Sequence, residues 1–283
     1  MLAIDSKLKG WTVRKALGSG AYGLVVVVEK DGIEAALKQT RDPRALFSFR
    51  VEQQILQQLS VGGGRNFVPT LLDSSFEGPQ SFQHPFLVMS LEDESLQSVI
   101  DRQRNQYMSR HQTIMTGYCV GNALKYLHGL GYVHQDIKPD NVLVSRSAGK
   151  AKLLLTDFGV AANVTQTGVT TGITVNTGYL YNDYRLMSGS RYTFVDDLGS
   201  LCYLMLGMRK ESRVFRGDCE DRKENRRKLE EGETKLSGKN SELQPMVCWV
   251  FRQDRRDSYD MPKLPPHDEF IAMMRSSPHF ATV

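Results

Sequence analysis

His134-Gln135-Asp136-Ile137-Lys138-Pro139-Asp140-Asn141 is followed, sixteen residues after Asn141, by Asp157-Phe158-Gly159. The two segments bring a carboxylate (Asp136), a lysine (Lys138), an amide (Asn141) and a second carboxylate (Asp157) into one short region. Each segment alone could occur by chance in a polar loop, but their order and spacing together make chance a poor explanation. Carboxylate and amide oxygens suit a hard cation such as Mg²⁺, and a well-placed carboxylate can orient a hydroxyl group. We therefore predict that this region carries the chemistry of the protein.

The composition is ordinary for a globular protein. The chain has 283 residues, of which 40% are hydrophobic and 24% charged, with a formal net charge of +4. Basic and acidic residues are interspersed, which argues against a nucleic-acid partner. The four cysteines lie far apart and the N-terminus has no signal-peptide core, so we expect free thiols and an intracellular location, cytoplasmic or nuclear. No apolar run reaches the ~18 residues that span a bilayer, so we expect no membrane association.

The first ninety residues are mainly β-prone, with one helical stretch. The expected strands are 11–17, 24–28, 33–38, 67–76 and 86–89, and the expected helix is 45–59. From about residue 95, helical patterns dominate, with long apolar faces over 114–127 and 198–208. We predict an α+β fold with a small β-rich N-terminal lobe, about residues 1–90, and a larger α-helical C-terminal lobe, residues 91–283.

Residues 209–242 stand apart because they form a charged insert with few apolar residues. An exposed charged helix or a mobile insert is the simpler interpretation, since both charge signs are nearly balanced. A docking surface or a nucleic-acid patch is the alternative.

Gly18, Gly20 and Gly23 fit the pattern G-x-G-x-x-G-x-V, which ends at Val25. Glycines between two strands let the backbone close over a phosphate chain. A dinucleotide-binding fold uses the same glycine pattern, but there the last glycine opens a helix, and residues 24–28 are too rich in valine for that. We therefore expect a β-hairpin over a nucleotide.

Lys38 follows three apolar residues on an expected strand, Ala35 to Leu37. A buried ammonium group is costly unless it is paired, and Glu52 on the following helix is the natural partner. This pair would leave Lys38 directed toward the α- and β-phosphates. Asp136 would orient a substrate hydroxyl, and Lys138 would neutralise charge on the transferred phosphoryl group.

This constellation resembles the eukaryotic protein kinase superfamily over most of the chain, and the resemblance implies one bilobal catalytic domain, residues 1–283. It implies that ATP and Mg²⁺ are the cofactors, with Mn²⁺ as an alternative, and that Asn141 and Asp157 bind the metal. By the same resemblance, Val25, Ala36 and Leu143 enclose the adenine, Met89 is the gatekeeper, and Ser90 and Leu91 form the hinge. It further implies that Asp197 anchors the catalytic loop, that Leu56, His134 and Phe158 form a spine between the lobes, and that residues 249–259 form closing helices.

Within the superfamily the chain is most similar to the casein kinase 1 group, which includes the vaccinia-related and tau-tubulin kinases. The similarity rests on the motif Asp196-Asp197-Leu198-Gly199-Ser200-Leu201, on Thr177-Gly178, and on the lack of an Ala-Pro-Glu triplet after the activation segment. Lys138 implies a serine or threonine acceptor. We therefore expect the chain to act on protein substrates, either as a monomer or together with a regulatory partner.

Two positions depart from the family pattern. Gln135 replaces the usual arginine, which commonly pairs with a phosphorylated activation loop, so we expect activity without phosphorylation of that loop. Tyr181 stands where many relatives carry an arginine for acidic or primed substrates, which puts such a preference in doubt. Arg213, Arg216 or Arg226 could substitute for it.

The main alternative to an active serine/threonine kinase is a pseudokinase or nucleotide-binding scaffold that acts through partners. Completeness of the site favours the enzyme, because degenerate relatives usually lose at least one of the residues that carry the chemistry. A small-molecule phosphotransferase is disfavoured by Lys138 and by a long activation segment suited to a peptide.

Overall fold

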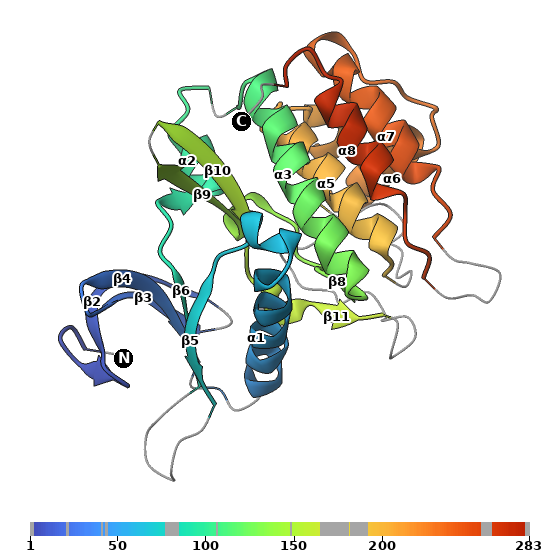
Figure 1. Cartoon of the computed structure of the whole chain (residues 1–283). Coiled ribbons are helices and arrows are strands. Elements are labelled where there is room, and N and C mark those ends of the chain that lie inside the picture. Colours follow the sequence, from blue (N-terminus) through green and yellow to red (C-terminus); the bar gives the residue numbers. More distant parts are fainter. Residues whose placement is uncertain are drawn as a thin grey trace.

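The computed structural model describes residues 3–20, 23–40, 42, 45–76, 85–105, 107–147, 149–164, 181, 192–255 and 262–280. A β-sheet with one helix lies at one end of the molecule, and a group of helices lies at the other (Figure 1). The strand-rich part comes first in sequence and the helical part second. The predicted α+β fold class is therefore confirmed.

The N-terminal part is built on a six-stranded antiparallel sheet. Its strands are β1 (Lys7–Leu8), β2 (Trp11–Gly20), β3 (Gly23–Lys30), β4 (Ile33–Gln39), β5 (Leu71–Ser75) and β6 (Phe86–Ser90), in the order β1-β2-β3-β4-β6-β5. Val26 and Val28, two residues apart on β3, join one buried cluster with Trp11 and Leu37. This alternation places one face of β3 in the core, as expected for a strand of period two.

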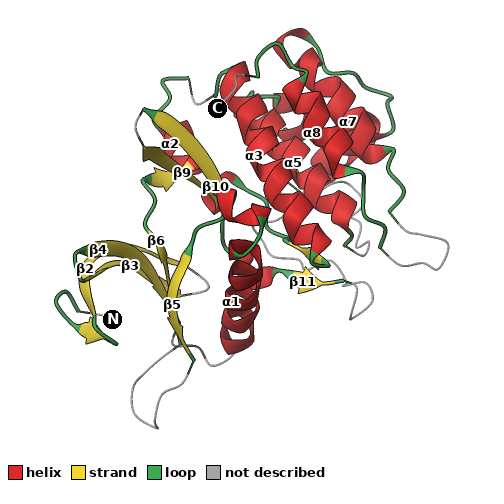
Figure 2. Cartoon of the chain, viewed as in Figure 1, coloured by secondary structure: helices red, strands yellow, loops and turns green. Residues whose placement is uncertain are grey.

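Helix α1 (Leu46–Ser60) lies beside this sheet (Figure 2). Its buried residues are Phe49, Glu52, Ile55, Leu56 and Leu59, a spacing that puts them on one face of a helix. Glu52 is the one charged residue among them, and it is 1% exposed. The same face therefore packs the helix and carries a carboxylate toward the sheet.

The C-terminal part is mainly helical, with six α-helices among its described residues. They are α2 (Leu96–Asp101), α3 (Arg110–Gly129), α5 (Phe194–Met208), α6 (Cys219–Glu230), α7 (Gln244–Phe251) and α8 (His267–Arg275). Helix α3 begins at a capping box in which Ser109 and Gln112 satisfy each other's backbone amides. Helix α5 begins at a capping box of Thr193 and Asp196, and nearly all of its residues are buried because it packs against α3 and α7.

The remaining described elements are short strands and 3₁₀ turns. They are β7 (Glu94–Ser95), β8 (Tyr132–Val133), β9 (Val142–Ser147), β10 (Lys150–Leu155) and β11 (Ala162–Asn163), with 3₁₀ turns η2 (Gly63–Asn66), η3 (Pro139–Asn141), η4 (Phe158–Val160), η6 (Ser212–Phe215) and η7 (Gly238–Leu243). Strands β9 and β10 form a hairpin in which Val142 faces Leu155. Because η3 precedes β9 and η4 follows β10, the hairpin brings the two segments of the predicted site together.

Two expected segments differ from the structure, and a third has one of its two expected forms. Only Leu71–Ser75 of the stretch 67–76 is a strand, because turn η2 and a bend precede it. Residues 249–259 were expected as closing helices, but α7 ends at Phe251 and residues 256–259 lie outside the described residues. Residues 209–242 were expected as an exposed charged helix or a mobile insert. They contain η6, α6 and most of η7, and all but two residues of α6 are exposed or half-buried, so the exposed charged helix is the interpretation that fits.

Candidate active site

A cavity of about 610 Å³ opens between the sheet and the helical part. The predicted nucleotide-site residues that line it are Gly18, Val25, Ala36, Lys38, Glu52, Met89, Leu91, Asn141, Leu143 and Asp157. Gly23, Asp136 and Lys138 are not among its described lining residues, and the surroundings of Gly20 lie outside the described part of the chain. The sequence therefore predicted about half of the residues that line this cavity, although they lie up to more than a hundred positions apart in the chain.

The glycine-rich turn serves two different purposes. A side chain at Gly18 would meet nothing within 4 Å, so this position leaves open space above the cavity. Gly23 has a φ of 131°, and a Cβ there would lie 2.1 Å from the carbonyl oxygen of Gln39. Glycine is therefore required at position 23 by the packing of β3 against β4, in addition to any contact with a phosphate.

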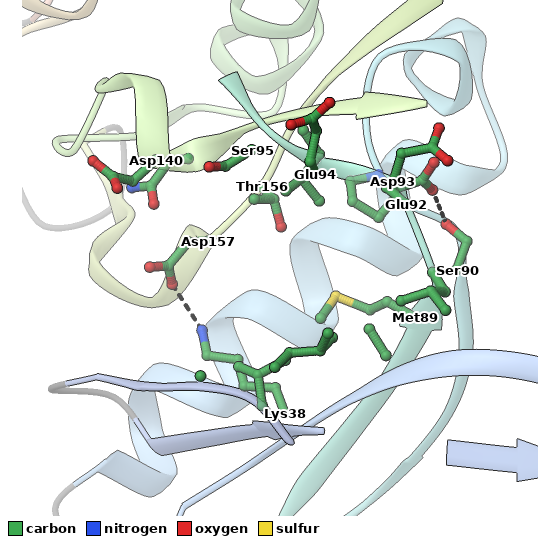
Figure 3. A pocket seen from close by; sticks show the side chains of 18 of the residues that line it. Lys38, Met89, Ser90, Glu92, Asp93, Glu94, Ser95, Asp140, Thr156 and Asp157 are labelled. Atoms are coloured by element: carbon green, nitrogen blue, oxygen red, sulfur yellow. Dashed lines mark hydrogen bonds and ion pairs between the residues drawn. The ribbon is translucent and has the colours of Figure 1, made fainter. Parts of the chain in front are cut away.

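Lys38 lies between two carboxylates. Its Nζ donates to Oε2 of Glu52 at 2.7 Å and to Oδ1 of Asp157 at 2.7 Å, across the cavity (Figure 3). Burial opposes a charge on Lys38, but the two carboxylates outweigh it and raise the pKa of the lysine. The expected Lys38–Glu52 pair is present, and Asp157 joins it.

The two carboxylates of this cluster behave differently. Burial raises the pKa of Glu52 despite the attraction of Lys38, and the charge of Asp157 adds to the rise. For Asp157, burial is outweighed by Lys38, which lowers the pKa of the carboxyl. Asp157 is thus an ionised carboxylate at neutral pH. Both carboxylates line the cavity, and Asp157 is the more exposed of the two.

The loop of residues 134–141 is closed by hydrogen bonds to Asp136. Lys138 Nζ donates to Oδ2 of Asp136 at 2.6 Å, and Asn141 Nδ2 donates to the same oxygen at 2.9 Å. Asn141 Nδ2 also lies 2.9 Å from the carbonyl oxygen of Asp136. Since these bonds use the amide nitrogen of Asn141, its carbonyl oxygen is the atom that can bind a cation.

Asp197 holds this loop from helix α5. Its Oδ2 accepts from the backbone N–H of His134 at 2.7 Å and lies 2.8 Å from Nε2 of His128. Its Oδ1 accepts from the backbone N–H of Gln135 at 3.0 Å and from the hydroxyl of Tyr192 at 2.8 Å. Gln135 adopts a φ of 69°, so the carboxylate stabilises a backbone conformation that is otherwise strained.

Burial opposes the charge of Asp197, but the hydrogen bonds from His128 and from the backbone N–H of His134 lower the pKa of this carboxyl. Its contribution to stability is therefore present above the ordinary pKa of an aspartate, about 4, and is lost as the pH falls below it. We expect Asp197→Asn to lower the free energy of unfolding at pH 7 by about 3 kcal/mol. Denaturant unfolding at pH 7 and at about pH 3 measures this, and the difference from the wild type should narrow at low pH.

Asp254→Asn is the matched control, because that side chain is 77% exposed. Among the described residues its one ion pair is with Lys263, at 3.3 Å. Equal stability of Asp197→Asn and the wild type at pH 7 would show that the carboxylate does not hold the loop.

The predicted spine residues lie together in the interior. Leu56 and Phe158 belong to one buried cluster, and the rings of His134 and Phe158 are 5.2 Å apart. His134 Nε2 also lies 3.0 Å from the carbonyl oxygen of Thr156. These contacts join α1, the loop of residues 134–141 and η4.

Sequence reasoning missed an acidic rim on the cavity. Glu92, Asp93, Glu94 and Asp140 line its mouth, and the first three follow the hinge directly in sequence (Figure 3). Glu92 accepts a hydrogen bond from the hydroxyl of Ser90 at 2.6 Å. The run of acidic residues after Leu91 was a visible signal, because charged residues that follow a buried strand tend to lie at its exposed end. Leu17, Pro69, Ser95, Ser98 and Thr156 also line the cavity and were not predicted.

Tyr181 has no positive charge, unlike the arginine that many relatives carry at this position. Burial raises its pKa to about 12, and the charge of Asp140 adds to the rise, so the phenol is neutral at neutral pH. Arg226, one of three arginines considered as substitutes, is fully buried, with its guanidinium 4.5 Å from the centre of the Tyr203 ring. Arg226 is therefore excluded as a surface contact. Arg216 is exposed, and the side chain of Arg213 lies outside the described residues.

The donor atoms suit the cofactors that the resemblance implies. Asn141 and Asp157 offer two oxygen ligands beside Lys38, and Mg²⁺ in phosphate sites is typically held by one or two protein groups together with phosphates and water. No cluster of three or more histidine, cysteine or acidic side chains able to hold a metal occurs among the described residues. An incomplete protein ligand set of this kind fits a metal that arrives with a nucleotide.

Comparisons with known proteins agree with this geometry. A family model described as the protein kinase domain matches residues 11–267. A probable casein kinase I homolog of Encephalitozoon cuniculi is 29% identical over 212 residues, which cover 71% of this chain and 62% of that protein. A putative casein kinase I of Caenorhabditis elegans is 29% identical over 204 residues, which cover 68% of this chain and 58% of that protein. The chain thus spans about three-fifths of the length of these relatives.

Among solved structures, that of vaccinia related kinase 3 superposes with a TM-score of 0.78. The match covers 99% of this chain and 94% of that chain, at 18% sequence identity. This similarity concerns the fold.

Proposed function

Because this chain belongs to the protein kinase family, whose domain model spans residues 11–267, we propose that it transfers the γ-phosphate of ATP to serine or threonine hydroxyls of proteins. The resemblance to the casein kinase 1 group that the sequence indicated is confirmed by the two casein kinase I relatives. Two hydrogen-bonded clusters support the proposal most. In the first, Lys38 binds Asp157. In the second, Lys138 and Asn141 both bind Asp136.

In this proposal each residue of the two clusters has a defined task. Lys38, held in place by Glu52, binds the α- and β-phosphates. The backbone of the glycine-rich turn covers the phosphates, and Val25, Ala36 and Leu143 enclose the adenine beside Met89 and Leu91. Mg²⁺, bound through Asn141 and Asp157, would neutralise charge on the phosphates.

Asp136 accepts a hydrogen bond from the substrate hydroxyl and directs its oxygen toward the phosphorus atom. Lys138 lies next to this carboxylate and stabilises the charge that develops on the transferred group. Since phosphoryl transfer needs little covalent help, positioning and charge stabilisation account for most of the expected rate enhancement.

Transfer of labelled phosphate from ATP to a library of serine-, threonine- and tyrosine-containing peptides tests the proposal. We expect labelling of serine or threonine peptides only. If the protein labels neither a peptide nor itself while it still binds ATP, the alternative of a pseudokinase or nucleotide-binding scaffold holds. Assignment of residues 1–283 to one catalytic domain is part of the same proposal.

We expect the protein to act without phosphorylation of its activation segment, because Gln135 offers an amide where relatives offer an arginine. Thr170, Thr171, Thr174 and Thr177, the acceptors considered, lie outside the described residues. Phosphatase treatment, checked by mass spectrometry, should change kcat by less than about twofold, since no charge-assisted contact is lost. Loss of turnover after dephosphorylation would contradict this prediction.

The family implies protein substrates, and no helix among the described residues is long and apolar enough to cross a membrane. A cytoplasmic or nuclear location, a monomeric state and a regulatory partner remain predictions from the sequence.

A further inference from the structure

A second cavity of about 490 Å³ lies on the helical part, between α2, α3 and the β9–β10 hairpin. We refer to it as the α2–α3 groove. Its deepest side chains are apolar, and Leu96, Val99, Met108 and Val144 are each at most 8% exposed. The half-buried Met115 lines it from α3. In Figure 1 the hairpin and α2 lie beside α3, away from β2, β3 and β4.

The groove has a positive rim. Arg146 and Lys150, both exposed, line it, and its described lining residues include no aspartate or glutamate. Burial raises the pKa of the lining residue Cys119 to about 11, so this thiol is neutral and adds no negative charge. The active-site cavity has the opposite character, because six carboxylates and one lysine line it. The groove therefore suits a ligand with negative charge, whereas the carboxylates of the active-site cavity suit one that brings a cation with it.

The groove and the active-site cavity share a wall. On β9, Leu143 lines the active-site cavity and the next residue, Val144, lines the groove, as expected for alternating side chains of a strand. On α2, Ser98 lines the first cavity and Val99 the second. A change in the position of α2 or β9 would thus alter both cavities.

An ion pair crosses this wall. Arg146, on the groove side, lies 2.7 Å from Oε1 of Glu94, which lines the active-site cavity. The backbone N–H of Arg146 also donates to Asp93 Oδ2 at 2.5 Å. The hydrogen bond from Arg102 lowers the pKa of Glu94 most, and Arg146 contributes further. Arg146 therefore neutralises part of the negative charge of the acidic rim from the groove side of the shared wall.

We propose that the α2–α3 groove binds an acidic peptide segment of a partner protein, with apolar side chains on the groove floor and carboxylates against Lys150 and Arg146. A carboxylate that approaches Arg146 competes with Glu94 for it and leaves more negative charge at the mouth of the active-site cavity. Peptide binding should therefore weaken ATP binding, and ATP should weaken peptide binding by the same factor. The docking itself does not depend on the proposed kinase activity, whereas the coupling rests on the proposed nucleotide site.

Fluorescence anisotropy with labelled short peptides that alternate leucine with glutamate, glutamine or lysine tests the docking, in the absence of ATP. We expect the glutamate peptide to bind about tenfold or more tightly than the lysine peptide, and to bind more weakly at high salt. Equal binding of the glutamate and lysine peptides, or no binding of either, would overturn the proposal. A polyaspartate peptide without leucine is the second probe, and if it binds as tightly as the leucine peptide, the floor is not used and the proposal fails.

Two variants locate the site. Lys150→Glu should lower affinity for the glutamate peptide about tenfold, and Met115→Gln should weaken it by removing an apolar contact while leaving the charges in place. Lys239→Glu, at an exposed position outside the groove, is the matched control and should bind like the wild type. Unchanged affinity in both groove variants would place the peptide elsewhere.

The coupling has its own measurement. Peptide affinity measured with and without saturating ATP and Mg²⁺ should differ by about fivefold, the low end of typical coupling between sites. Asp136→Asn, which removes the proposed catalytic carboxylate but no groove residue, should bind the peptide like the wild type. Unchanged peptide affinity with ATP bound would reject the role of Arg146. If the wild-type protein binds the peptide normally but transfers no phosphate, the proposed function fails and the docking proposal stands.

Discussion

Replacing Asp136 by asparagine is expected to lower kcat for peptide phosphorylation by about 10²–10⁴-fold while leaving the affinity for ATP within a few fold. The carboxylate is 8% exposed, and one of its oxygens accepts from both Lys138 and Asn141. An asparagine side chain has one oxygen and one NH₂ group, so it can satisfy these donors or orient the substrate hydroxyl, but not both. Single-turnover transfer of labelled phosphate measures the effect on the chemical step.

Asp254→Asn serves again as the matched control, because it removes one exposed carboxylate far in sequence from the loop. It should transfer phosphate at the wild-type rate. Equal labelling by Asp136→Asn and the wild type would show that Asp136 does not have the proposed role. A lower rate combined with loss of ATP binding would instead indicate that the variant disturbs the loop as a whole.

The parts of the site that the sequence predicted are those with a local pattern or a strict energetic requirement. Asp136 and Asn141 lie within six residues, and their hydrogen bond closes a single turn. Lys38 and Glu52 come from different elements, but a lysine on a buried strand needs a partner, and α1 offers one buried carboxylate. In both cases the chemistry of a few side chains restricts the structure more strongly than secondary-structure propensity does.

Other features depend on contacts that no short segment reveals. The bond between Lys38 and Asp157 joins residues 119 positions apart, and it forms because β4, α1 and the end of β10 meet at the cavity. Gly23 was assigned to phosphate binding, but the close carbonyl of Gln39 gives it a structural requirement that the glycine pattern alone does not show.

Helix α6 departs from its charge composition at one position. Its sequence predicts an exposed charged surface, yet Arg226 is fully buried and its guanidinium lies over the rings of Tyr203 and Phe215. Aromatic faces attract a cation, and the stabilisation grows when water is excluded. Because one aromatic ring comes from α5 and the other from η6, the pattern within α6 could not predict this burial.

The second large effect is expected for Lys38→Met, which should abolish detectable phosphate transfer and also destabilise the fold. Removal of the ammonium group leaves the carboxylates of Glu52 and Asp157 close together with no cation between them, an arrangement that typically costs about 3–5 kcal/mol. Burial already raises the pKa of Glu52, and loss of Lys38 raises it further. The folded variant then binds a proton more tightly than the unfolded chain, so its stability should fall as the pH rises above the ordinary range of a glutamate.

The double variant Lys38→Met/Glu52→Gln separates stability from catalysis. It removes the cation together with one of the two carboxylates, so denaturant unfolding should show most of the stability restored and little dependence on pH between about 5 and 8. Its phosphate transfer should remain undetectable, because no ammonium group is left to bind the phosphates. If the double variant regained activity along with stability, Lys38 would act only as a structural partner of the carboxylates, and its assignment to the phosphates would be wrong.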